Sequence, residues 1–345
     1  MSAGASSVRG AGRSRSGSGR ALQLGLGAVQ LGPIAVLLTI WAIFTALTPL
    51  FFTEVNAQNL LAQSSVVGAL ALGQLLVIVT GGIDLSQGST LALATVVGAK
   101  LAESGSSTML VLVAMLAAGA GVGLINGLIL VKGRIGQPFI VTLGMLSVVS
   151  GAAFLLSDGG AITGMPTAVQ TAGSGFLGGI PVPALVVLGV GSLAFVLTHR
   201  LKWGSWLYGI GGDPEAARRV GIPVDRMLVS VYVLSGVAAA VGGIIVAGRT
   251  NSGFPTAGQL TELDAISAVI IGGASFFGGR GGIWNALVGA LILGSIRNGL
   301  NLLGVSAYWQ LVAIGAILIA AVGLDVLRGH IEGRLRTAQV ERAGG

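Results

Sequence analysis

The densest set of charged side chains lies between Asp213 and Gly221, in a chain in which only 9% of the 345 residues are charged. Asp213 suits the N-cap of a short helix, and Pro214 suits its first position. Arg218 and Arg219 fall in the last turn, where the helix dipole favours cations, and Gly221 ends the helix. Because a helix of about two turns is marginal alone in water, we expect these charges to bind a partner. The alternative is a solvated interfacial helix, since amphipathic surface helices are common.

A second chemically notable residue is Asp84, in the glycine-rich segment 81–88 between two apolar runs. A charge at membrane depth is costly unless it is paired or hydrated, so such a residue is a candidate functional site. The alternative is an ordinary cytoplasmic loop in which Asp84 or Ser86 caps the following helix. The sequence leaves both interpretations open.

Other side chains on apolar runs are candidates for a solute path, although Ser and Thr in membrane helices more often bond their own backbone or a neighbour. The candidate path residues are Asp84, Asn126, Phe139, Thr142 and Ser147. Glu262 and Asp264 begin a later apolar run, and for them we expect a contact at the outer surface.

The residues that most enzymatic mechanisms require are missing. None of the lysines, Lys100, Lys132 and Lys202, lies in a Gly-Lys-Ser/Thr phosphate-binding loop, so the chain is not expected to hydrolyse ATP. The two histidines lack ligand-like spacing, and the absence of cysteine excludes disulfides and thiolate metal sites. We predict that the chain is not an enzyme and binds no metal or cofactor of its own.

The composition places these residues in a membrane. Hydrophobic residues make up 53% of the chain and the mean hydropathy is +0.90, which leaves too few charges to cover a soluble domain of this size. The net charge of +7 is confined to short segments between apolar runs, which indicates orientation in a lipid bilayer and no binding of nucleic acid. We predict an all-α polytopic membrane protein.

A crossing needs roughly 20 mainly apolar residues, and on that criterion the sequence predicts about ten transmembrane helices. They are 30–50, 58–79, 88–103, 108–131, 138–157, 182–199, 226–247, 262–278, 283–302 and 308–327. The third and the eighth border the glycine-rich segments 81–88 and 272–282, and we interpret the second of these segments as a structural break.

The basic residues orient these helices. With the N-terminus in the cytoplasm, all but Lys100, Arg249 and Arg297 of the 19 basic residues fall on the inner side, as the positive-inside rule expects. Both termini are therefore predicted to be cytoplasmic.

Three regions follow from the same pattern. Residues 1–27 are predicted to be a disordered basic cytoplasmic tail, 28–328 the membrane domain, and 329–345 a cytoplasmic C-terminal tail. A signal peptide is the alternative for the first region, but no clear cleavage site follows it.

A parallel internal repeat is also indicated. A shift of 196 residues places Asp84 on Arg280, and each of these follows a glycine pair and precedes a basic helix end, Lys132 or Arg328, by 48 residues. Helices two to four and eight to ten would then run in the same orientation, as in parallel transporter repeats. The alternative is a coincidence among glycine-rich helices.

Several of these segments together resemble one known family. The segments are 81–88, 123–127, 140–144, 208–249 and 262–282. They resemble the ribose-type permease subunit of bacterial ABC sugar importers, within the branched-chain amino acid and sugar permease superfamily, and the resemblance covers about residues 33–328.

The resemblance implies a permease subunit of the bacterial inner membrane that works as a pair, with a homodimer expected. A separate ABC ATPase subunit would bind ATP and Mg on the cytoplasmic side, and a periplasmic or lipid-anchored binding protein would deliver a monosaccharide such as ribose, xylose or galactose. The segment 213–221 is similar to the coupling helix that docks in the ATPase. The residues given this role are Gly212, Asp213, Pro214, Glu215, Ala216, Ala217, Arg218, Arg219 and Gly221.

Two alternatives remain at this stage. A branched-chain amino acid permease would carry zwitterions, which favour charged partners in the path, and Asp84 is the only obvious candidate. An ion-coupled secondary transporter would need no ATPase, but such carriers usually have more intramembrane acids or histidines than this chain offers. The sequence does not name the sugar.

Overall fold

A computed structural model describes the fold of residues 32–344, with side chains described for 32–323, 325 and 326. Most of it is helix, and the predicted tail 1–27 lies outside the described residues. After a first helix, Gly32–Leu47, the helices are α2 (Glu54–Val79), α3 (Gln87–Glu103), α4 (Thr108–Lys132), α5 (Pro138–Ser157), α6 (Thr167–Ser174), α7 (Val182–His199), α8 (Lys202–Gly212), α9 (Pro214–Arg219), α10 (Val224–Thr250), α11 (Thr261–Ile271), α12 (Ile283–Leu302) and α13 (Ala307–Gly344).

The all-α polytopic prediction is confirmed, but the count of ten spans is not. Within the described residues, six helices are long and apolar enough to cross a membrane: α2, α4, α5, α7, α10 and α12. Shorter apolar helices occupy Gly32–Leu47 and Ala307–Gly323.

The third and eighth predicted spans are the main departures. α3 has 17 residues and α11 has 11, so at 1.5 Å per residue they reach only about 26 Å and about 17 Å. The predicted span 262–278 is wrong at its C-terminal end, because Gly273 takes a left-handed φ of 92° and the chain then leaves the helix. Burial explains why a short α3 is tolerated, since neighbouring helices rather than lipid cover most of it.

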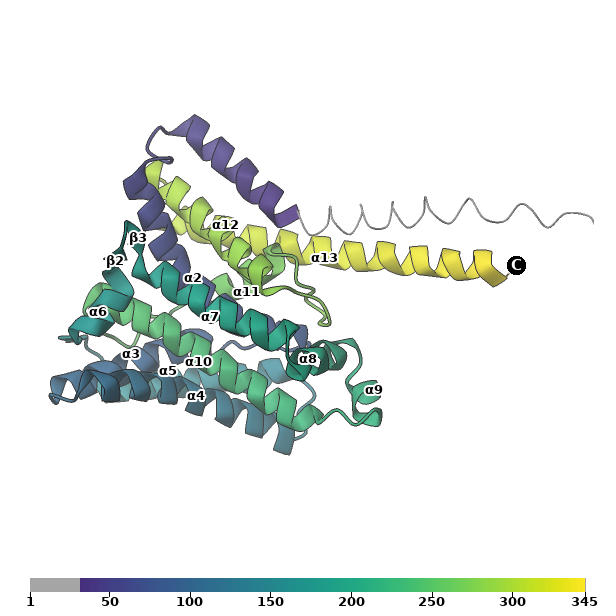
Figure 1. Cartoon of the computed structure of the whole chain (residues 1–345), viewed down its shortest axis with the longest axis horizontal. Helices are drawn as coiled ribbons and strands as arrows, with labels where there is room; N and C mark the ends of the chain where they lie inside the picture. Colours follow the sequence, from purple (N-terminus) through teal and green to yellow (C-terminus); the bar gives the residue numbers. More distant parts are fainter. Residues whose placement is uncertain (1–31, 345) are drawn as a thin grey trace, which may run out of the picture.

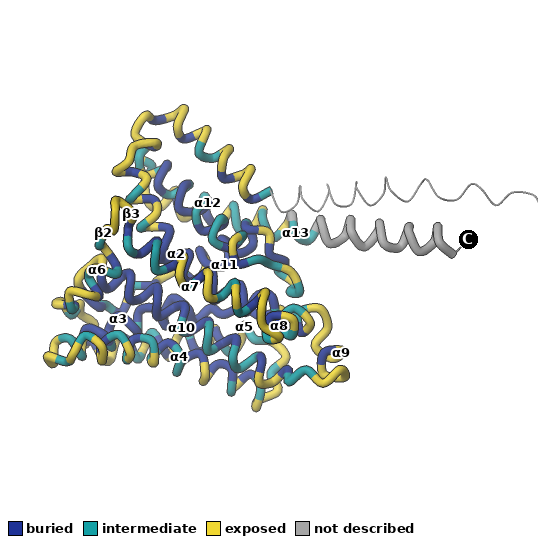
Figure 2. Tube along the Cα trace, in the orientation of Figure 1, coloured by how far each residue is buried: buried dark blue, intermediate teal, exposed yellow. Residues whose placement is uncertain are grey.

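α2 and α10 form the centre of the bundle, and α4, α5 and α7 lie outside them (Figure 2). In the 18-residue apolar stretch that identifies α2 as a membrane span, 89% of the residues are buried, against 22% in the corresponding stretch of α5. The outer helices expose large apolar side chains, for example Leu155 at 82% and Leu193 at 70%, as expected for surfaces that contact lipid or another subunit. α4 and α10 approach closely because Gly119 and Gly236 face each other, and a Cβ on either would overlap the carbonyl oxygen of the other.

The two ends of the bundle differ (Figure 1). At one end lie α8, α9 and the segments 80–86 and 272–282, and we call this the α9 end. The two segments meet there, because a Cβ on Gly278 would crowd the backbone nitrogen of Gly81. The backbone N–H of Gly279 also donates to the carbonyl oxygen of Val79, the last residue of α2, at 2.9 Å. At the opposite end, which we call the strand end, short strands pair antiparallel: β1 (Ile162–Thr163) with β4 (Ser252–Gly253), and β2 (Phe176–Leu177) with β3 (Ile180–Pro181).

This arrangement bears on the predicted repeat. α2 and α11 both end at the α9 end, and α3 and α12 both begin there. The corresponding helices therefore share a direction, as a parallel repeat requires. Their lengths differ, however, since α2 has 26 residues and α11 has 11, and the repeat stays a prediction.

Candidate functional site

α9 forms where the sequence predicts the capped helix. The Asp213 carboxylate accepts hydrogen bonds from the backbone N–H groups of Glu215 at 2.9 Å and Ala216 at 3.0 Å, which satisfies two donors of the first turn. The helix runs from Pro214 to Arg219, and Gly221 follows with a left-handed φ of 84°. The predicted start and end signals are therefore confirmed.

α9 presents its charges to solvent. Ala217 alone is buried, at 4%, and it packs into the main apolar core. The Arg218 guanidinium donates to the Asp225 carboxylate at 2.5 Å, and this hydrogen bond raises the pKa of Arg218 further above its ordinary value. The side chains of Glu215 and Arg219 are exposed and make no ion pair with a described residue. These two charges are free to meet a partner.

α8, which the sequence analysis did not predict, connects α9 to the membrane helices. Its Tyr208 hydroxyl donates to the carbonyl oxygen of Gly281 at 2.7 Å, and burial raises the pKa of Tyr208, which keeps this donor protonated. Gly211 packs directly against the backbone of Val79 and Gly279. A movement of α9 would therefore reach both segments of the α9 end through α8.

The sequence did contain a signal for α8. Trp203, Leu207 and Ile210 recur at helical spacing, and the last two are fully buried. The glycines of the same segment obscured this pattern, because a glycine-rich stretch is typical of a loop.

Asp84 lies inside a buried polar cluster. Its carboxylate accepts from the backbone N–H of Ser86 at 3.0 Å, from the Ser86 hydroxyl at 2.7 Å and from the Ser235 hydroxyl at 2.7 Å. The Asn126 amide donates to Ser86 at 2.9 Å, and the Gln87 amide donates to Ser235 at 2.9 Å. Asp84 is 2% exposed and forms no ion pair with a described cation.

Gln74 closes the cluster from α2. With its amide oriented to suit its neighbours, it donates to the carbonyl oxygen of Asp84 and to the Gln87 side chain, both at 3.1 Å, and accepts from the Asp84 N–H at 3.2 Å. Burial rules out an ordinary solvated loop for this segment. The capping alternative is met in part, because Asp84 accepts the Ser86 backbone N–H at the start of α3, whereas Ser86 itself makes no side-chain cap bond. Gln74, Gln87 and Ser235 were missed by sequence reasoning, although each is a polar residue in an otherwise apolar run.

The candidate path residues divide into two groups. Asp84, Asn126 and Thr142 come together, since the Thr142 hydroxyl donates to the carbonyl oxygen of Ile83 at 2.9 Å. Phe139, at 45% exposure, and Ser147 lie on the outward surface of α5, away from this cluster. The path itself stays a prediction.

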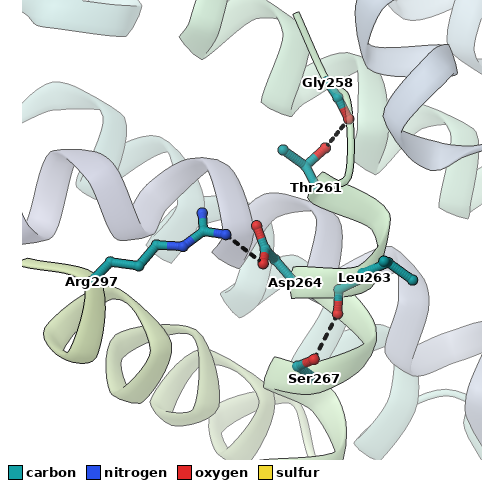
Figure 3. Close-up of polar contacts among 6 residues, drawn as sticks. All are labelled: Gly258, Thr261, Leu263, Asp264, Ser267 and Arg297. Carbon is teal, nitrogen blue, oxygen red and sulfur yellow. Dashed lines mark hydrogen bonds and ion pairs between the residues drawn. The ribbon is translucent and has the colours of Figure 1, made fainter. Parts of the chain in front are cut away.

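A partly buried ion pair lies in the half of the bundle toward the strand end. Arg297 of α12 points to Asp264 of α11, and its Nη2 donates to Oδ1 at 2.7 Å (Figure 3). Asp264 is 3% exposed and Glu262 is 7% exposed, so the expected surface contact of these acids is wrong for the single chain. Within the described residues, no group of His, Cys, Asp and Glu has the arrangement of a metal site.

Comparison with known proteins gives a consistent set of relatives. A family model described as "Branched-chain amino acid transport system / permease component" matches residues 56–322. The chain is 43% identical to the ribose import permease protein RbsC of Bacillus subtilis, over 86% of this chain and 92% of the relative. It is 40% identical to RbsC of Escherichia coli K12, over 85% and 92%, and 39% identical to that organism's galactose/methyl galactoside import permease protein MglC, over 86% and 94%. No solved structure matches the chain significantly.

Proposed function

The chain belongs to the family of branched-chain amino acid transport system permease components, and on that premise we propose that it is the membrane permease subunit of an ABC importer for a monosaccharide. The observation that carries this proposal is α9, a capped helix with exposed charges at one end of a membrane bundle. Because the chain has no phosphate-binding loop, a partner has to supply the driving force for transport. An exposed, capped helix suits the docking of that partner.

The names of the relatives favour a sugar over a branched-chain amino acid. Permeases for ribose, allose, fructose and galactose are 36–43% identical to this chain. A zwitterionic amino acid would favour charged side chains along its path, whereas a neutral sugar needs mainly hydrogen-bonding groups. The buried polar cluster around Asp84 is rich in such groups.

The assembly follows from the same role. A separate ATPase would bind ATP and Mg and dock on α9, and a periplasmic or lipid-anchored binding protein would deliver the sugar at the strand end. A second copy of the chain would complete the membrane unit. The chain would lie in the bacterial inner membrane with both termini in the cytoplasm, where most basic residues then fall.

The mechanism is alternating access driven from the α9 end. Closure of the ATPase on ATP would move α9, and α8 would carry that movement through Gly211 and Tyr208 to the segments 80–86 and 272–282. These segments join α2 to α3 and α11 to α12, so they are placed to change how the helices pack.

Co-purification tests the docking role. The ATPase subunit should purify with the wild-type chain and be lost when Glu215, Arg218 and Arg219 are all changed to Ala. A matched control changes Lys100 and Glu103 to Ala, an exposed ion pair on α3 at the strand end. An ATPase that stays bound to the triple variant as tightly as to the control would contradict the proposal.

A further inference from the structure

A cavity of about 440 Å³ lies between α2, the end of α10, α11 and α12, beside the Asp264–Arg297 ion pair. This volume is within the range of roughly 300–1,000 Å³ that is typical of small-molecule sites. The cavity is in the half of the bundle toward the strand end, since its lining includes Thr250, just before β4. We call it the Arg297 cavity.

The lining of the Arg297 cavity combines donors, acceptors and an aromatic ring. Its charged residues are Arg249, Asp264 and Arg297, and Asn59, Gln63 and Phe254 add two amides and an aromatic ring. They come from α2, α10, the loop that follows it, α11 and α12, so the site depends on the tertiary fold.

The polar groups of this lining are not saturated by the protein. Arg297 carries several N–H donors, and only Nη2 donates to a described residue, the Oδ1 atom of Asp264. The other carboxylate oxygen of Asp264 accepts no hydrogen bond from the described residues. The side chains of Asn59 and Gln63 are exposed, and their amides form no hydrogen bond with a described residue, so they are open to a solute.

The chemistry of these groups suits a polyhydroxylated solute. Adjacent hydroxyls of a sugar both donate and accept, and Arg297, Asp264 and the two amides offer both functions. Asp264 offsets the charge of Arg297, and the remaining positive charge of the lining comes from the exposed side chain of Arg249. The ring of Phe254 offers an apolar surface to the C–H side of a sugar.

We propose that the Arg297 cavity is a transit site for the imported monosaccharide, in which Arg297 and Asp264 contact the solute directly. The inference rests on the proposed function and extends it to named residues. A site of this kind binds weakly, because the solute must leave it toward the α9 end in the same cycle.

Uptake kinetics in proteoliposomes that hold the complete importer test the contact. With D-ribose as probe, Arg297→Met and Asp264→Asn should each raise the half-saturating concentration by roughly tenfold or more, as expected for the loss of a charged hydrogen bond. ATP hydrolysis stimulated by the binding protein should stay near the wild-type rate. The matched controls Lys100→Met and Glu103→Gln alter an exposed pair and should leave uptake unchanged.

Arg297→Lys separates solute contact from a structural role. Lysine can keep the ion pair with Asp264 but loses the planar fork of donors. A structural role predicts near-normal uptake for this variant, whereas direct contact predicts a raised half-saturating concentration at an unchanged unfolding temperature. Wild-type kinetics in Arg297→Lys and Asp264→Asn would overturn the inference.

Cysteine protection gives a readout that does not require transport. The chain has no cysteine, so a single Gln63→Cys places one thiol at the cavity and Ser174→Cys places one on α6 outside it. D-ribose should slow maleimide labelling at the first position and not at the second. Equal rates with and without sugar would overturn the site even if the wild-type importer transports ribose. Failure of wild-type uptake with normal protection would instead count against the proposed function.

Discussion

Asp84 is held by hydrogen bonds on both carboxylate oxygens, in a cluster that draws on α2, α3, α4 and α10. A buried acceptor with such donors stabilises a particular packing of the helices, because each donor would lose its partner if the helices shifted. This makes the cluster a junction between helices as well as a candidate part of the solute path.

Replacing Asp84 with Asn should therefore destabilise the fold. The amide would present N–H groups to hydroxyls that now donate to a carboxylate, and the expected loss is about 1–3 kcal/mol of unfolding free energy. Thermal unfolding of the purified chain in detergent measures it. Asp158→Asn is the control, since Asp158 is exposed in a left-handed cap conformation that Asn tolerates. Equal unfolding temperatures for both variants would show that the Asp84 hydrogen bonds contribute little.

At the residue scale, the sequence identified single residues better than their partners. Asp213, Arg218 and Gly221 were placed correctly because caps and dipole preferences are local rules. The partners of Asp84 and Asp264 lie far away in sequence, Ser235 and Arg297 for example, and no local pattern connects them.

Among the elements, α8 is packed tightly against the end of α2 and the segment 272–282. A Cβ on Gly211 would overlap the carbonyl oxygen of Val79 and crowd the N–H of Gly279, the two groups that hydrogen bond to each other. Only glycine allows this approach.

Gly211→Ala should cost about 1–3 kcal/mol of unfolding free energy, as expected for overpacking against backbone. Gly212→Ala is a matched control one residue away, because no atom lies within 4 Å of its added Cβ. Unfolding temperatures of the two variants in detergent provide the comparison. A loss of stability as large in Gly212→Ala as in Gly211→Ala would rule out the proposed close contact.

Hydropathy located most helices but not their full extents. α2, α4, α5, α7, α10 and α12 appear near their predicted positions, since long apolar runs are unambiguous. α3 and α11 are shorter than a full crossing, and α8 was missed, because in these places glycine-rich breaks and tertiary burial decide the local structure.

At the scale of the whole molecule, the distribution of basic residues predicts which end of the bundle faces the cytoplasm. If the α9 end is cytoplasmic, an impermeant maleimide added outside intact cells should label Ser174→Cys at the strand end and not Glu215→Cys on α9. The lack of native cysteine makes each label unambiguous. Labelling should reverse in inside-out vesicles. External labelling of Glu215→Cys in sealed cells would invert the orientation and remove α9 from the reach of a cytoplasmic ATPase.

Composition is enough to identify a membrane protein, but it does not show how α9 is connected to the membrane helices. An apolar chain with sparse, one-sided charges can be assigned to the membrane without a structure. The meeting of segments 80–86 and 272–282 beneath α8 depends on contacts across the whole chain, and only the three-dimensional arrangement reveals it.

The central claim is that this chain moves a sugar only when a separate ATPase acts on α9. The direct measurement is D-ribose uptake by proteoliposomes that contain the importer, with and without enclosed ATP, for the wild-type chain and the triple Ala variant at Glu215, Arg218 and Arg219. The account predicts uptake that requires ATP and is lost in the triple variant. Uptake that persists without ATP under an ion gradient would contradict it.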